Sequence, residues 1–256
     1  MNRLLRLTRF RRLDRAAPRA GVGLPADVAA DLALGPVRLY NLRYASLPGH
    51  GQILHQDAAR TTPVTELTDP IGSVVDLVTG EHYLTSSGTQ RPLWDGLDGG
   101  LGDGLDDRLL GTLPDIDPPW TIVLRLRGAR NNYPADFDSG NSMQVRWFAA
   151  NSNWRMLRTS TNYLAFEPSQ DAPGADTLQR MWVRVGGSTQ HGRIVRADAV
   201  SYDTEAVVGT LEPNPLDALA LFASNDGAVT WAGRITSVAI YDGLRDPADL
   251  DSLPLE

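Results

Sequence analysis

The 256-residue sequence contains neither cysteine nor lysine. Without cysteine the chain can form no disulfide bond and no metal site built on thiolates. It also lacks any apolar run that approaches the ~18 to 20 residues of a membrane-spanning helix, so we expect no membrane insertion. All 24 basic residues are arginine, and alanine, glycine, proline and aspartate are plentiful, which favours a GC-rich coding genome.

Glutamate is scarce too: the chain has six, and no two of them are closer than seven positions. Glycoside hydrolysis needs two carboxylates at a set separation, and this spacing excludes a glutamate pair a few residues apart on one strand. The chain contains no Gly-x-Ser-x-Gly and no His-Glu-x-x-His sequence, the marks of serine hydrolases and zinc peptidases. We therefore expect a protein that is not an enzyme.

The net charge of −7 conceals an uneven distribution of charge along the chain. Residues 1–20 carry seven arginines and one aspartate, a net of +6, whereas the other 236 residues carry 17 arginines and 30 acidic residues, a net of −13. Residues 1–20 are called the basic arm below. Its arginines recur about every three residues, so they share no single helical face, and it lacks the uninterrupted apolar stretch of a secretory signal.

We expect the basic arm to anchor the protein by ordering against an acidic protein surface. Two alternatives remain open: a tail without fixed structure, and contact with nucleic acid, which the acidic remainder of the chain disfavours. The arginines expected to make the anchor are Arg3, Arg6, Arg9, Arg11, Arg12 and Arg15.

Apolar and β-branched runs separated by turns dominate the chain after residue 69. The clearest strand is 120–127, which has no competing helix signal, and 71–77 is a second apolar run bounded by turns. Further strands are expected at residues 37–44, 143–149, 154–158, 163–166, 179–185, 193–197, 219–223 and 231–241. A short helix is expected from near Pro25 to Gly35, and no convincing helix lies between 69 and 239. This pattern predicts two packed antiparallel sheets.

Four parts of the sequence, in chain order, resemble one known type of domain. Residues 56–64 followed by 69–72 are similar to the entry of that domain, and 103–109, which reads DGLDDRL, resembles its DG-x-DD-x-L strand. Residues 233–242 resemble its closing strand, and 246–250 resemble its short tail. The domain is the concanavalin A-like lectin/laminin-G jelly roll found in many phage virion proteins.

The resemblance implies an all-β fold, a two-sheet antiparallel jelly-roll sandwich with a short N-terminal arm and helix. We divide the chain into the basic arm at 1–20, an adaptor at 21–54 with the short helix and a strand, and the jelly roll at 55–256. The adaptor strand is expected to join the sheet of the body or to pair with a neighbouring subunit. Gly102 departs from the family pattern, because an aromatic residue usually stands there.

The resemblance and the basic arm together predict a non-enzymatic virion appendage: a spike, a fibre or a tail-associated protein. Its N-terminus would dock on other virion proteins, and its jelly roll would bind host surface polysaccharide. We expect a homo-oligomer on the surface of a phage or phage-like particle. Two alternatives remain open: a purely structural decoration protein of the virion, and a carbohydrate-active enzyme with a site built from aspartates.

Strand alternation predicts a positively charged sheet face. If Ile122, Leu124 and Leu126 face the core, the residues between them face outward. A tryptophan flanked by arginine forks suits an anionic polysaccharide. The residues expected to bind carbohydrate are Arg125, Arg127, Arg146, Trp182 and Arg184. The alternatives are a solvated face, a subunit interface, or a sugar site in the loops at 128–141 or 168–176.

An acidic, glycine-rich turn region lies between residues 95 and 107. Flexible loops that are rich in oxygen atoms can hold Ca²⁺. The residues expected to bind such a metal are Asp103, Asp106 and Asp107. The alternative is that these aspartates only shape turns and carry solvated charge. We expect no cofactor other than this Ca²⁺.

Overall fold

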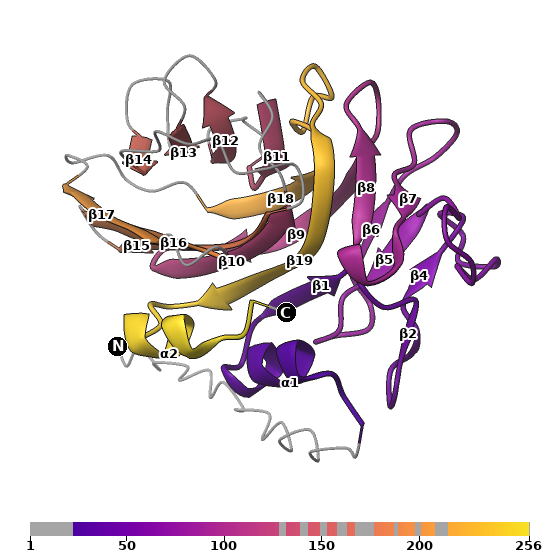
Figure 1. Cartoon of the computed structure of the whole chain (residues 1–256), viewed down its shortest axis with the longest axis horizontal. Helices are drawn as coiled ribbons and strands as arrows, with labels where there is room; N and C mark the ends of the chain where they lie inside the picture. The colour runs from indigo at the N-terminus through magenta and orange to yellow at the C-terminus, as the bar shows by residue number, and fades with distance from the viewer. Residues whose placement is uncertain are drawn as a thin grey trace, which may run out of the picture.

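The protein is described here from a computed structural model of the whole chain. The structure describes residues 23–127, 132–138, 143–148, 153–157, 163–166, 177–186, 189–197, 201–207 and 215–255. Within these residues two antiparallel sheets face each other as a sandwich (Figure 1). The predicted all-β fold class is therefore confirmed.

One sheet has eight strands, and its long central strand is β19. In spatial order its strands are β17 (Ser201–Val207), β16 (Thr189–Arg196), β15 (Leu178–Gly186), β10 (Trp120–Arg127), β19 (Ala232–Asp242), β8 (Gly100–Asp103) and β7 (Leu93–Trp94). The eighth strand, β1 (Arg38–Asn41), pairs with the second half of β19. The adaptor strand therefore joins the sheet of the body, which is the first of the two arrangements that the sequence predicted.

The other sheet has nine strands. In spatial order they are β14 (Tyr163–Phe166), β13 (Asn153–Leu157), β12 (Gln144–Phe148), β11 (Asn132–Asp136), β18 (Leu216–Leu221), β9 (Leu109–Ile116), β6 (Tyr83–Thr85), β5 (Ser73–Val75) and β4 (Leu54–His55). A separate hairpin joins β2 (Ser46–Leu47) to β3 (Gly51–Gln52), and a single 3₁₀ turn, η1, spans Gly96–Asp98.

The core lies between the two sheets and follows the predicted alternation along β10. Ile122 and Leu124 are buried opposite Val183 and Met181 of β15. The indole Nε1 of Trp154, on β13, donates a hydrogen bond of 2.9 Å to Gln179 on β15, so this buried polar group is satisfied across the two sheets. Removal of these apolar side chains from water is the main favourable contribution to folding.

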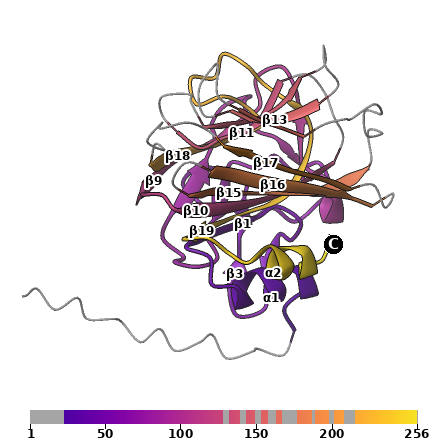
Figure 2. The same cartoon turned by 90° about the vertical axis from the view of Figure 1, so that its left-hand side faces the viewer.

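Two helices cover the opposite face of the eight-stranded sheet. Helix α1 spans Ala26–Ala33 and helix α2 spans Pro247–Ser252. Asp246 caps α2 by accepting a hydrogen bond from the backbone N–H of Ala248, and Pro247 occupies its first position. Figures 1 and 2 show the two helices side by side against the strands around β1 and β19. No helix in the described part of the chain is long and apolar enough to cross a membrane.

The element predictions are confirmed where the hydrophobic pattern is strong. Strands β10 and β14 have the expected bounds, and α1 lies within the predicted helix. The strands β9 and β17 were not expected, because glycine, proline and charged residues interrupt their apolar pattern. Both pair with long, regular neighbours, so tertiary pairing overrides their weak local propensity.

Candidate functional site

The predicted carbohydrate-binding face of the eight-stranded sheet is not open to solvent. Trp182 is 0% exposed and Arg125 is 1% exposed, so the prediction that they face water is wrong. The alternation itself is correct, because both residues point away from the sandwich core. They are buried because α1 and α2 lie on that face: Asp31 of α1 pairs with Arg125, and Asp251 of α2 accepts a 2.9 Å hydrogen bond from Nε1 of Trp182.

The other three predicted carbohydrate ligands are not brought together with these two at an open surface. Arg127 is mostly buried, and its Nε lies 3.1 Å from Asp98 of η1. Arg184 is half-buried on β15, between Thr121 of β10 and His191 of β16. The backbone of Arg146 belongs to β12, but its side chain is outside the described residues. Arg125, Arg127 and Trp182 are therefore engaged with the aspartates that cover this face, and Arg146 belongs by its backbone to the other, nine-stranded sheet.

Loops that connect the sheets gather polar groups at one end of the sandwich. We call residues 86–91, 103–108 and 224–230 the loop edge; the last two of these loops lie near one another at the top of Figure 1. Thr89 Oγ1 lies 3.2 Å from a carboxylate oxygen of Asp106, and Arg108 Nε donates to Gln90 Oε1 at 3.1 Å. Thr230 Oγ1 donates to the carbonyl of Gly104 at 2.7 Å. The first two bonds join loops that are 17 and 18 positions apart in sequence, and the third joins loops that are 126 positions apart.

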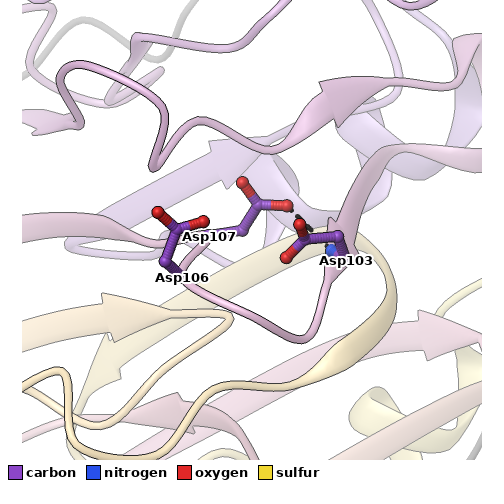
Figure 3. A group of neighbouring side chains, drawn as sticks. All are labelled: Asp103, Asp106 and Asp107. Atoms are coloured by element: carbon purple, nitrogen blue, oxygen red, sulfur yellow. Dashed lines mark hydrogen bonds between the residues drawn. The ribbon is translucent and has the colours of Figure 1, made fainter.

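The loop edge contains the three predicted metal ligands (Figure 3). One carboxylate oxygen from each of Asp103, Asp106 and Asp107 lies within 4.8 Å of the others. Asp103 accepts a 2.7 Å hydrogen bond from the N–H of Leu105, and Asp107 accepts one of 2.8 Å from the N–H of Asp103. The sequence therefore placed these aspartates together correctly, and each of these two hydrogen bonds also shapes the turn.

A hard cation fits this cluster geometrically. Two oxygens on one Ca²⁺, at 2.3–2.6 Å each, are separated by at most about 5 Å. One oxygen of Asp103 and one of Asp107 make no hydrogen bond to the turn, so they could bind a cation while the turn bonds persist. Burial raises the pKa of Asp107 to about 6, because its ionised form is poorly solvated and lies near two other carboxylates. A bound cation would offset that cost. Three carboxylates are fewer than the six to eight ligands that Ca²⁺ takes, so water would supply the rest.

A strained residue fixes the position of the third loop of this edge. Phe222 has a φ of +66°, which is unfavourable for an aromatic residue and is maintained only by surrounding contacts. Its ring packs beside Trp231 and fills the space next to Gly102, where an added Cβ would lie 2.6 Å from the ring. The family pattern has an aromatic residue where this chain has Gly102. Phe222, which directly follows β18, fills that place with its own ring.

The loop edge continues toward β11 through Asn225. Its backbone N–H donates to Asp136 at 3.1 Å, and its side-chain amide donates to the carbonyl of Asp138 at 3.0 Å. Asp136 is fully buried and also accepts a 3.0 Å bond from Gln144, and burial raises its pKa. The sequence did not indicate Thr89 or Asn225, because only pairing with other segments brings them to this edge; Arg108 lies in the same turn as the predicted aspartates, but an arginine carries no metal-ligand signal.

The remaining predicted site residues lie outside the described part of the chain. They are the anchoring arginines Arg3, Arg6, Arg9, Arg11, Arg12 and Arg15. Most of the two alternative sugar loops, at 128–141 and 168–176, also lies outside it. The anchoring role of the arm therefore stays a prediction.

Comparison with known proteins gives a fold and no family. The sequence matches no protein-family model and no curated protein. A solved GH54 α-L-arabinofuranosidase soaked with a cyclic sulfate inhibitor superposes with a TM-score of 0.54 at 12% identity, over 90% of this chain and 64% of that one. An arabinofuranosidase complexed with arabinofuranosyl-α-1,2-xylobiose gives 0.52, with the same identity and coverage.

A carbohydrate-binding module is less similar: CBM40 of a Ruminococcus gnavus IT-sialidase, bound to α2,6-sialyllactose, gives a TM-score of 0.39 at 9% identity, over 54% of this chain and 83% of that one. At such identities the likeness concerns the fold alone. The chain has the concanavalin A-like jelly-roll fold and spans about 64% of the length of the arabinofuranosidases that it matches.

Proposed function

We propose that this protein is a non-enzymatic carbohydrate-binding protein of a phage or phage-like virion, which binds glycans at the loop edge. The observation that carries the proposal is the composition of that edge. Leu105 is 80% exposed, and the same edge presents the carboxylates of Asp103 and Asp106, the hydroxyl of Thr89 and the guanidinium of Arg108. An apolar contact for a sugar ring beside donors and acceptors for its hydroxyls is what a sugar site requires.

The hydrogen bonds of the carboxylates favour binding over hydrolysis. One oxygen from each of Asp103, Asp106 and Asp107 lies within 4.8 Å of the others, which is shorter than the about 6.5 to 9.5 Å between the carboxyl groups of an inverting glycosidase and close to the about 5 to 5.5 Å of a retaining one. Asp103 and Asp107 also accept backbone N–H groups that hold the turn. The similarity in fold to arabinofuranosidases supports a carbohydrate ligand for this protein. It does not extend their hydrolytic activity to this chain.

The virion role rests on the charge split between the basic arm and the acidic body. A segment of net +6 attached to a body of net −13 can bind an acidic surface on a particle while the body faces the host. Several copies on one particle would raise the avidity of individually weak sugar contacts.

A glycan array of bacterial surface polysaccharides tests the binding function. Wild-type protein should bind, and Leu105→Ala should weaken binding about three- to tenfold, because an exposed leucine contributes on the order of 1 kcal/mol of apolar contact. Leu67→Ala is the matched control, since Leu67 is also well exposed, at 64%, but lies on a different loop. Equal loss in both variants, or no binding by the wild type, would contradict the proposal.

Particle incorporation tests the virion role separately. Protein without residues 1–20 should keep its glycan binding but should be absent from purified particles. Normal incorporation of the truncated protein would show that the arm is not the anchor.

A carbohydrate-active enzyme is the second candidate, and one observation favours it. Asp107 has a pKa raised to about 6, the property of a general acid in a glycosidase. Release of reducing ends from a bound polysaccharide, abolished by Asp107→Asn, would establish this second function. Binding without any loss of polymer length supports the first.

A further inference from the structure

An acidic pocket lies at the end of β9 that is far from the loop edge. It measures about 400 Å³ and lies where the end of β9, the start of β1 and the end of β19 meet. The backbone N–H of Val37 bonds to the carbonyl of Ile240, and that of Gly243 bonds to Pro119, which fixes its walls. The residues that line it are Val37, Arg38, Pro114, Asp115, Ile116, Asp117 and Asp242.

The three carboxylates of this pocket have no partner within the described residues. Asp115, Asp117 and Asp242 are all exposed, and none makes an ion pair or a side-chain hydrogen bond there. Several other aspartates of the described body are paired with arginine, as in Arg125–Asp31 and Arg234–Asp95. Three unpaired negative charges on one pocket favour a cationic ligand.

Arg38 lines the same pocket but does not compensate these three carboxylates. Arg38 is 8% exposed, and its Nε is buried without a hydrogen-bond partner among the described residues. Its Nη1 is already engaged with the carbonyl of Val37 and lies 3.6 Å from Asp76. The charge of Arg38 is therefore directed to Asp76, and its buried Nε is out of reach of a ligand in the pocket, so Asp115, Asp117 and Asp242 remain without a counter-charge from Arg38.

We propose that this pocket binds the basic arm of the same copy of the chain. The arm combines seven arginines for the carboxylates with apolar residues for Val37 and Ile116. The apolar residues of the arm are Leu4, Leu5, Leu7, Phe10 and Leu13.

The connection between arm and pocket makes binding within one copy favourable. The chain passes from the arm through α1 directly to Val37 and Arg38, which are two walls of the pocket. Residues 1–22 can extend to about 70 Å, which is longer than any strand of the sandwich. The arm is therefore long enough to reach the pocket. A short tether also gives a high effective concentration, which favours the arm of the same copy over that of another.

This inference goes beyond the proposed anchoring role, because it assigns the arm a site on the free protein. A particle that takes up the protein would then have to offer a more favourable acidic surface and displace the arm from Asp115, Asp117 and Asp242. The pocket would thereby hold the arginines of the arm away from other anions before assembly.

Limited trypsin digestion of the full-length protein tests the proposal, since trypsin cleaves after arginine. The measurement is the initial rate of cleavage within residues 1–20, followed by mass spectrometry. The double variant Asp115→Asn/Asp117→Asn and the single variant Asp242→Asn should each be cleaved faster in the arm. We expect an increase of about three- to tenfold, because exposed ion pairs are individually weak. Added salt should accelerate cleavage of the wild-type arm and abolish the difference.

Glu66→Gln is the matched control. Glu66 is exposed, and its loop is held by a hydrogen bond from the N–H of Thr68 to the carbonyl of Trp94 on β7. Strand β7 pairs with β8, and β8 pairs with the first half of β19, whereas the pocket lies at the end of β19. It should leave arm cleavage unchanged, and melting temperatures should show that all variants stay folded. Equal cleavage in the wild type and the pocket variants would overturn the proposal. Protection that increases with protein concentration would also overturn it, in favour of an arm supplied by a second copy. Neither outcome bears on particle incorporation or on glycan binding, which test the proposed function.

Discussion

The guanidinium of Arg125 forms a two-point ion pair with the carboxylate of Asp31, Nη1 to Oδ2 at 2.7 Å and Nη2 to Oδ1 at 3.1 Å. Each side chain is 1% exposed, and the pair joins α1 to the middle of β10 across 94 positions of sequence. Arg125 Nε also donates to the carbonyl of Pro254, so one side chain connects the sheet to both ends of the described chain. These bonds compensate the buried charge of Arg125, which would strongly destabilise the folded state if it had no partner.

Asp31→Asn should therefore be strongly destabilising. It leaves the charge of Arg125 buried without a counter-ion, which costs about 3 to 5 kcal/mol in comparable cases. Denaturant unfolding of wild type and variant measures the difference. Asp98→Asn is the matched control, because its pair with Arg127 is half exposed, and it should cost less than about 1 kcal/mol. Equal effects of the two variants would show that Asp31 and Arg125 do not join α1 to the sheet.

Trp182 should behave as a core residue. Trp182→Ala should lower the free energy of unfolding by about 3 to 5 kcal/mol, because it removes a fully buried indole and leaves a cavity beneath α2. Trp182→Phe should cost less, since it mainly loses the hydrogen bond to Asp251. Arg184→Ala, on the same strand but half-buried, should change stability by less than about 1 kcal/mol. Unchanged melting of Trp182→Ala together with lost glycan binding would restore the sheet face as a sugar site.

The local pattern of the sequence predicted which way these side chains point but could not predict what covers them. Alternation along β10 placed Leu124 inside and Arg125 outside the sandwich, and both placements hold. The cover over Arg125 and Trp182 comes from α1, α2 and Pro254, whose hydrogen bonds to the sheet span 69 to 129 positions. No short-range signal specifies such a distance. Arg125 was interpreted as solvated, whereas it is buried because it meets the opposite charge of Asp31.

The candidate site and the acidic pocket were also predictable only in part from the local sequence. Asp103, Asp106 and Asp107 were predicted together because one glycine-rich turn contains all three. Asp115 and Asp117 flank the buried Ile116 and could have been predicted to share an exposed side of the chain. Their association with Arg38 and Asp242 could not, because it depends on the pairing of β1 with β19, about 200 positions apart.

Asp107 should make stability depend on pH in a defined direction. Burial raises its pKa to about 6 in the folded state, against 3.8 for the ordinary group, so the folded protein binds this proton more tightly. Protonation therefore favours folding below about pH 4, and this contribution is lost as pH rises to about 6. Asp107→Asn, which can still accept the bond from Asp103 N–H, should be more stable than wild type by about 1 to 2 kcal/mol at neutral pH. Melting of both proteins across this range should show the difference disappearing near pH 4; a variant that is less stable at every pH would contradict the assignment.

Calcium should reverse that difference if the turn is a metal site. Ca²⁺ that binds only the folded state stabilises it by about 2.7 kcal/mol at a hundredfold excess over Kd, and it also removes the cost of ionising Asp107. Wild-type protein should therefore melt at a higher temperature in Ca²⁺ than in a chelator at neutral pH. Asp103→Asn and Asp107→Asn should lose this shift, whereas Asp98→Asn, outside the cluster, should keep it. Mg²⁺ should have less effect, because three carboxylates on a flexible turn do not impose its octahedral geometry. Identical melting of the wild type with Ca²⁺ and with chelator would show that these aspartates serve only the turn, through the bonds that Asp103 and Asp107 accept from its backbone.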